Sequence, residues 1–174
     1  MSGIILYQSK YGSTRKYAQW LSKMTDYPWV ETKKADIREF SQYDTVILGG
    51  GVYASKIAGL SFLKRHRKQL QGKRILVFAV GASPEDGQAL ETLRQKNLRG
   101  SLEGVPLFYC RGAWDLEEMT WLHRTLCSKL IKNVQKKDPS QYEPWEEALM
   151  DASDGGCDWT DKGYLTPILE VLEK

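Results

Sequence analysis

The stretch IILYQSKYGST, residues 4–14, places a short apolar run directly before a loop rich in hydroxyl groups. The run Ile4–Tyr7 is typical of a buried strand in a parallel sheet. In the loop, Gly12 lets the backbone turn closely, and the N–H groups at the start of the following helix attract anions. The pattern therefore predicts a strand, a phosphate-binding loop and a helix, although a simple helix N-cap is the alternative. The loop hydroxyls belong to Ser9, Ser13 and Thr14.

Further apolar runs suit a parallel sheet with helices between its strands. Three runs resemble the first in length and composition: Thr45–Leu48, Ile75–Val80 and Val105–Tyr109. A weaker segment, Trp29–Lys33, alternates as an edge strand does. Helical spacing of apolar residues appears in the segments 14–24, 60–70 and 89–93, whereas Asp36–Phe40 leaves room only for a turn or a very short helix. This alternation predicts a doubly wound α/β fold.

The chain after the last predicted strand is longer than one closing helix requires. Asp115–Lys137 has the spacing of a long amphipathic helix, and we expect its apolar stripe to be buried against the body of the protein. A helix lying on a membrane and a dimer contact are the alternatives. A loop segment with a short helix at Glu146–Met150 follows, and Leu165–Leu172 closes the fold. The stripe consists of Met119, Leu122, Leu126, Leu130 and Val134.

Length and composition predict one domain over residues 1–174, with residues 113–161 as an excursion before the closing helix. Lys and Arg number 25 against 22 Asp and Glu, an excess too small to indicate nucleic acid as a partner. The first residues have neither the basic start of a signal peptide nor the length of a membrane span, so we expect a cytoplasmic protein. Cys110, Cys127 and Cys157 form neither a disulfide framework nor a metal motif.

The loop matches neither the ATP P-loop pattern nor the dinucleotide fingerprint. It resembles the FMN-phosphate loop of the flavodoxins, [ST]-x-[ST]-G-x-[ST], through Ser9, Gly12 and Thr14, and departs from it at Tyr11. Lys10, a basic residue after the first hydroxyl position, makes it more similar to the flavodoxin-domain group that includes the menaquinone-dependent protoporphyrinogen oxidases.

Two later stretches extend this resemblance to residues 4–114. The sequence YDTVILGGGVYASK at 43–56 is similar to the group's third strand and the loop after it, and KRILVFAVG at 73–81 is similar to its fourth strand. The resemblance implies a flavodoxin-like, five-stranded parallel sheet of order 2-1-3-4-5 with helices on both faces. It also implies FMN as the cofactor.

An isoalloxazine ring needs flat apolar walls and close backbone, which the Gly-rich segment Gly49–Tyr53 offers as a flexible turn. We expect Tyr53 to stack on the ring and Gly81–Ser83 to face its other side, although Ser83 could simply cap a helix before Pro84. Arg111 leaves the fifth strand on the same rim. The predicted cofactor-binding residues are Ser9, Lys10, Tyr11, Gly12, Ser13, Thr14, Gly50, Gly51, Val52, Tyr53, Gly81, Ala82 and Ser83. No catalytic residue is assigned, because His66 and His123 lie among charged neighbours and read as solvated.

Three functions fit this site: an FMN-dependent oxidoreductase, a one-electron carrier, and a scaffold without flavin. The basic residues Lys10, Lys56 and Arg111 favour the oxidoreductase, because carriers of this type present an acidic rim to their partners. The resemblance implies protoporphyrinogen oxidase activity as the most specific form, with a quinone as acceptor and a tetrapyrrole as substrate. A redox protein is the alternative partner. Peripheral membrane contact and a homodimer are further expectations.

Overall fold

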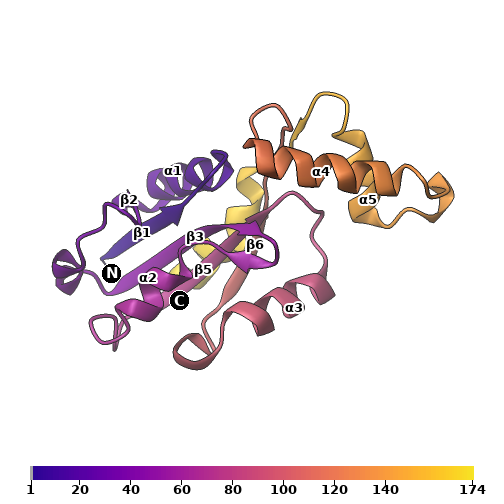
Figure 1. Ribbon diagram of the computed structural model, residues 1–174. Helices are drawn as coiled ribbons and strands as arrows, with labels where there is room; N and C mark the ends of the chain where they lie inside the picture. The colour runs from indigo at the N-terminus through magenta and orange to yellow at the C-terminus, as the bar shows by residue number, and fades with distance from the viewer. Residues whose placement is uncertain (1) are drawn as a thin grey trace.

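The computed structural model describes residues 2–174, and five parallel strands form its central sheet (Figure 1). Their order is β2-β1-β3-β5-β6, which confirms the predicted order because β4 (Lys56–Ile57) only pairs antiparallel with the end of β3. Ile5 of β1 is in register with Ile47 of β3. The parallel strands are β1 (Gly3–Gln8), β2 (Trp29–Glu31), β3 (Thr45–Tyr53), β5 (Arg74–Gly81) and β6 (Leu107–Arg111).

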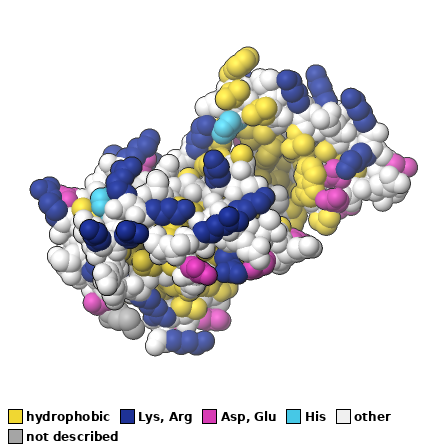
Figure 2. Space-filling view, turned by 60° about the horizontal axis from the view of Figure 1, so that its bottom comes forward, with side chains coloured by type: hydrophobic (Ala, Val, Ile, Leu, Met, Phe, Trp, Pro, Cys, Tyr) yellow, Lys and Arg dark blue, Asp and Glu magenta, His cyan; other side chains and the backbone are white. Residues whose placement is uncertain are grey.

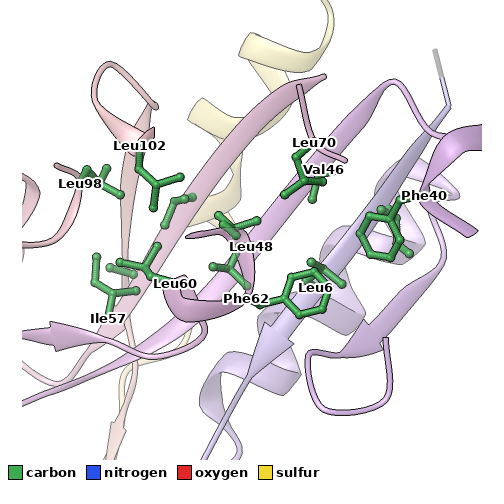
Figure 3. Close-up of a cluster of buried hydrophobic side chains, with 14 of the residues drawn as sticks. Leu6, Phe40, Val46, Leu48, Ile57, Leu60, Phe62, Leu70, Leu98 and Leu102 are labelled. Atoms are coloured by element: carbon green, nitrogen blue, oxygen red, sulfur yellow. The ribbon is translucent and has the colours of Figure 1, made fainter. Parts of the chain in front are cut away.

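Both faces of the sheet are covered, as the continuous apolar runs of its strands require. On one face, α1 (Ser13–Thr25) and α6 (Thr166–Leu172) pack against the odd-numbered side chains of β1 and β3. On the other, α2 (Leu60–Arg65) and α3 (Gly87–Asn97) pack against the even-numbered side chains. Figure 3 shows this second core, where Leu6 and Leu48 meet Phe62. Short 3-10 helices complete the body: η1 (Ile37–Gln42), η2 (Gly100–Leu102) and η4 (Lys162–Leu165).

The Gly-rich segment after the third strand is not a flexible turn, which corrects the sequence prediction. Residues 49–53 continue β3. Glycine is needed there for close packing: a Cβ atom at Gly49 would lie 2.2 Å from the Phe78 ring, and one at Gly50 would lie 2.2 Å from the Ala58 carbonyl oxygen. These glycines therefore allow close packing within the sheet. The turn comes later, at Ala54 and Ser55, where φ is +47° and +60°. The fifth parallel strand also begins two residues later than predicted, at Leu107.

The excursion, residues 113–161, lies beyond the carboxyl ends of the strands (Figure 1). Its two helices are α4 (Trp121–Val134) and α5 (Pro144–Asp151), the second close to the predicted short helix. A small core of its own joins them through Ile131, Val134 and Leu149. Two strands, β7 (Ala113–Trp114) and β8 (Cys157–Asp158), pair antiparallel at its base, and η3 (Pro139–Gln141) lies between the helices.

Helix α4 corrects two sequence predictions about this region. It begins at Trp121 rather than Asp115, because residues 115–120 form a turn. The carbonyls of Leu116 and Glu117 in this turn accept hydrogen bonds from the Arg124 guanidinium. The predicted apolar stripe is also not buried. Only its last member, Val134, is enclosed, whereas three leucines are 39–58% exposed: Leu122, Leu126 and Leu130.

One tyrosine holds both ends of the excursion. The buried Tyr17 hydroxyl donates to the Arg111 carbonyl at 2.6 Å and accepts from the Asp161 N–H at 3.0 Å, and burial raises the pKa of this phenol. Beside it, Lys16 Nζ lies 2.8 Å from Asp158. Partial burial opposes ionisation of Asp158, but the hydrogen bonds from Lys16 and Thr160 outweigh it and lower its pKa to about 2. Helix α1 thus fastens the excursion to the sheet.

Two further findings concern the described part of the chain as a whole. Between residues 2 and 174, no helix combines the length and the apolar character needed to cross a membrane. Within the same range, His, Cys, Asp and Glu side chains form no group that would hold a metal ion.

Candidate cofactor-binding site

A cavity of about 320 Å³ opens at the carboxyl ends of β1, β3 and β5. Doubly wound sheets bind their ligands at this edge, and the volume falls at the lower end of the roughly 300–1,000 Å³ that ligand pockets span. The cavity brings together many of the predicted binding residues: Ser9, Tyr11, Ser13, Thr14, Gly51, Val52, Tyr53, Gly81 and Ala82. Lys10, Gly12, Gly50 and Ser83 lie outside its lining.

The loop before α1 has the donors that an anion requires. The Ser9 hydroxyl accepts the Gly12 N–H at 3.1 Å, and the Ser13 hydroxyl accepts the Ala113 N–H at 3.1 Å. Each hydroxyl acts here as an acceptor, so its own hydrogen remains to be donated. No side chain caps α1, which leaves the N–H groups of its first turn for a ligand. Thr14, in that turn, is almost fully enclosed and lines the cavity.

Two loop residues face the excursion instead of the anion position. The Tyr11 hydroxyl lies 2.5 Å from Nδ1 of His123, and Lys10 Nζ lies 3.3 Å from Nε2 of the same ring. The Lys10 N–H, a predicted phosphate donor, is used by the Tyr53 hydroxyl at 3.1 Å. The position where this loop departs from the flavodoxin pattern is therefore the one that contacts α4.

The two loops that follow β3 and β5 form opposite walls of the cavity. Tyr53 contributes its ring, whose centroid lies 6.1 Å from that of Tyr11, and burial raises the pKa of the Tyr53 phenol. Gly51 is required beneath it, because a Cβ atom there would lie 2.5 Å from the Tyr53 hydroxyl oxygen. On the β5 side, a Cβ atom at Gly81 would lie 2.7 Å from the Tyr109 hydroxyl. The walls are thus close-packed and mostly apolar.

Gly50 and Ser83 do not reach the cavity. Gly50 is buried against the Ile57–Ala58 segment, while the Ser83 carbonyl accepts the Tyr109 hydroxyl outside the pocket. Ser83 is not a helix cap either. Asp86 caps α3 by accepting the Ala89 N–H at 2.6 Å.

The contribution of the excursion to the cavity was not predicted from the sequence. His123, which read as a solvated residue, lines the cavity and contacts the phosphate loop. The spacing of four between Met119, His123 and Cys127 would place them on one face of the predicted helix Asp115–Lys137. Periodicity alone does not show what packs against that face. Trp114 also lines the cavity, and its Nε1 is buried with no hydrogen-bond partner among residues 2–174. The missed lining residues are Ala54, Val80, Gly112, Ala113, Trp114, Met119, His123, Leu126 and Cys127.

Arg111 does not line the cavity, although it leaves β6 on the expected rim. Its guanidinium lies 4.1 Å from the Trp159 ring centroid, and its Nε donates to the Ala82 carbonyl at 3.2 Å. His66 packs against Phe62, away from the site. Burial raises the pKa of the Cys127 thiol, which keeps it in the neutral form.

The donor set suits a ligand with an anionic end and a flat apolar end, as FMN has. Hydroxyl and backbone donors gather at the start of α1, and the apolar walls lie beyond them. The residues present therefore fit this group.

Comparison with known proteins gives a family model and several similar structures. A family model described as a flavodoxin domain matches residues 4–141. A two-electron reduced flavodoxin from Megasphaera elsdenii shares 17% identity over 62% of this chain and 82% of its own, with a TM-score of 0.48. A flavodoxin, WrbA-like protein from Agrobacterium tumefaciens shares 18% identity over 69% and 85%, with a TM-score of 0.45.

A longer protein is also similar in structure. Rubredoxin oxygen:oxidoreductase from Desulfovibrio gigas shares 16% identity over 86% of this chain and 36% of its own, with a TM-score of 0.46. No curated protein matches the sequence.

Proposed function

Because the chain belongs to the flavodoxin domain family, whose model matches residues 4–141, we propose that it is an FMN-dependent oxidoreductase. Family membership indicates FMN as the cofactor. Bound FMN supplies redox chemistry, and the protein supplies binding, orientation and electrostatics. The residues described above divide these tasks between the phosphate loop and the cavity walls.

The phosphate loop would hold the anionic end of the cofactor. The hydroxyls of Ser9, Ser13 and Thr14 and the N–H groups of the first turn of α1 supply donors, and the helix dipole adds its positive end. Tyr53 and the backbone at Gly51 and Gly81 would bound the ring. Tyr11 and Lys10 then act on the position of α4 through His123, not on the phosphate.

One observation carries the choice of enzyme over carrier: side chains of α4 and the turn before it form part of the cavity wall. A carrier needs the edge of its cofactor open to a protein partner. Here an inserted segment adds Met119, His123 and Leu126 to the wall, which suits an organic substrate with an apolar face better than a protein surface. His123 also brings a group that can hold a proton at its ring nitrogens, beside the Tyr11 hydroxyl.

The most specific form of the proposal is a protoporphyrinogen oxidase-like reaction with a quinone acceptor. The resemblance of residues 4–114 to that group supports it, and the apolar wall suits a quinone or a tetrapyrrole. Lys56 is an exposed cation that remains for a carboxylate of a tetrapyrrole, and the exposed Lys10 would reach one only by leaving His123. Arg111 is withdrawn from that role because it stacks on Trp159.

Replacing Thr14 tests the cofactor site. Thr14→Ala removes one hydrogen bond to a phosphate, so FMN affinity should fall by about 1.5–3 kcal/mol, while riboflavin affinity should not change. Fluorescence titration measures both. Thr92→Ala is the matched control, because the Thr92 hydroxyl only bonds the Gln88 carbonyl within α3. Equal loss of riboflavin and FMN would contradict the phosphate assignment, and no flavin binding by the parent protein would favour the scaffold.

Reoxidation kinetics test the reaction. After photoreduction of the FMN-loaded protein, a soluble menaquinone analogue should reoxidise it faster than a one-electron acceptor such as a cytochrome. The reverse order would favour the carrier. If the quinone is the better acceptor, protoporphyrinogen is the first donor to try, and Lys56→Ala should raise its KM with little effect on kcat. An unchanged KM in that variant and in Lys10→Ala would remove the tetrapyrrole from the proposal but not the enzyme.

A further inference from the structure

The excursion separates its charges by sign along the chain. Residues 121–137 contain no Asp or Glu, whereas residues 138–161 contain no Lys or Arg. The first segment covers α4 and the second covers α5. The basic residues are Arg124, Lys129, Lys132, Lys136 and Lys137, and the acidic ones are Asp138, Glu143, Glu146, Glu147, Asp151, Asp154, Asp158 and Asp161.

Most of these charges are not neutralised within the chain. Lys137 pairs with the buried Glu146, which raises the pKa of Lys137 and lowers that of Glu146, and this pair ties α4 to α5. Lys129 and Lys132 make no ion pair among residues 2–174. The same holds for the exposed acids of α5, Glu147 and Asp151, which are one helical turn apart.

An apolar surface lies between the two sets of charges. Four large apolar side chains of α4 are exposed: Trp121 at 79%, Leu122 at 58%, Leu126 at 57% and Leu130 at 39%. Figure 2 shows hydrophobic side chains gathered in a hollow, with Lys and Arg along its upper edge and at its lower left, and with Asp and Glu at its right. The α4–α5 surface, by which we mean these four apolar residues with Lys129, Lys132, Glu147 and Asp151, therefore has an apolar centre, a basic side and an acidic side.

We propose that the α4–α5 surface binds a second copy of this chain in a two-fold dimer. Under a two-fold rotation, the basic side of one copy meets the acidic side of the other, and the apolar centres meet each other. Such an interface is self-complementary in both charge and apolar character. Because α4 and α5 project beyond the sheet (Figure 1), the pair is accessible to a partner.

Charge complementarity favours this occupant over an anionic membrane. A lipid surface would attract Lys129 and Lys132 but repel Glu147 and Asp151 on the neighbouring helix. A second copy satisfies both sets at once. The proposal does not depend on the enzymatic function, although the α4–α5 surface borders the cavity, whose wall includes Leu126.

Charge exchange between two variants gives the sharpest test. Sedimentation velocity of the FMN-loaded protein at about 100 µM should show a dimer, weakened by salt. Lys129→Glu with Lys132→Glu should weaken the dimer more than about tenfold, and Glu147→Lys with Asp151→Lys should do the same. An equimolar mixture of the two variants should restore the dimer, because the new glutamates on α4 of one variant then face the new lysines on α5 of the other. Leu122→Asp should also give a monomer.

The chain offers a matched control for net charge. Arg67→Glu with Lys68→Glu changes the charge equally at exposed positions after α2, and this variant should remain a dimer. Circular dichroism checks that every variant is folded. A monomeric parent protein, or a dimer that survives both reversals and Leu122→Asp, would overturn the proposal. A monomer that pellets with phosphatidylglycerol vesicles would also overturn it and would make a lipid surface the occupant.

Discussion

The sheet and the excursion bury their apolar residues to very different extents. In the sheet, Ile5, Leu6, Ile47 and Leu48 have no exposed surface, because helices cover both faces. In the excursion, α4 encloses only its side toward α5 and the cavity, and its leucine stripe stays in contact with solvent. The same residue type therefore contributes to stability in one region and forms a surface in the other.

An apolar pattern specifies a helix or strand but not its partner. Leu48 lies in a continuous apolar run and Leu126 in a helical apolar stripe, yet the first is enclosed and the second is 57% exposed. Burial follows from what the topology places opposite the pattern. The difference between the two regions can be measured by changing similar residues in each.

The largest effect is expected from truncating leucines. Leu48→Ala should lower the free energy of unfolding by about 2–5 kcal/mol, because it leaves a cavity between fixed neighbours. Leu122→Ala in the excursion should change it by less than about 0.5 kcal/mol, because the side chain is already exposed. Urea unfolding at a concentration where both proteins are monomeric measures the two values. Similar losses would mean that α4 is covered within the monomer.

A smaller effect is expected from adding a methyl group to a glycine in each region. Gly49→Ala places a Cβ atom 2.2 Å from the Phe78 ring, and we expect a loss of roughly 1–3 kcal/mol from overpacking. Phe78→Leu in the same chain should recover part of it. Gly155→Ala in the excursion meets nothing within 4 Å and should be close to neutral. A neutral Gly49→Ala would show that the sheet yields more easily than its packing indicates.

The smallest effect concerns the contact between the two regions. The folded-state pKa of Asp158 is about 2, below its ordinary 3.8, so its contribution to stability is complete above pH 4 and is lost as the pH falls toward 2. Because Asp158 is more than half exposed, the pair with Lys16 should contribute less than about 1 kcal/mol. Unfolding of Asp158→Asn and of the parent should converge at acid pH. Asp154→Asn, without an ion pair among residues 2–174, should track the parent throughout.

Much of the fold followed from the sequence because the sheet obeys rules that act locally. The run Ile4–Tyr7 and the loop to Thr14 predicted β1, a turn and α1 at nearly their observed positions. The Gly49–Tyr53 segment was misassigned as a turn, because glycine serves both flexible backbone and close packing. Phe78, the residue that requires Gly49, lies on another strand.

The candidate site was only partly predictable for a similar reason. The strand ends that meet at one edge gave Ser9, Thr14 and Tyr53, since the topology alone brings them together. His123 was missed because its position depends on how α4 folds back over the loop. Tyr11 departs from the hydroxyl pattern of the loop, which indicated a different role for this residue. That it contacts His123 became evident only in the structure.

The Tyr17 hydroxyl, which bonds the last residue of β6 and the N–H of Asp161, bears on how such proteins diversify. The two ends of the excursion are bonded to the same hydroxyl oxygen, so the segment between them is a closed loop whose ends are already fixed. For loops of this kind, doubling the length adds only about 0.6 kcal/mol of closure entropy. Insertions of very different size and chemistry can therefore be exchanged at this point during evolution while the sheet and its phosphate loop stay the same.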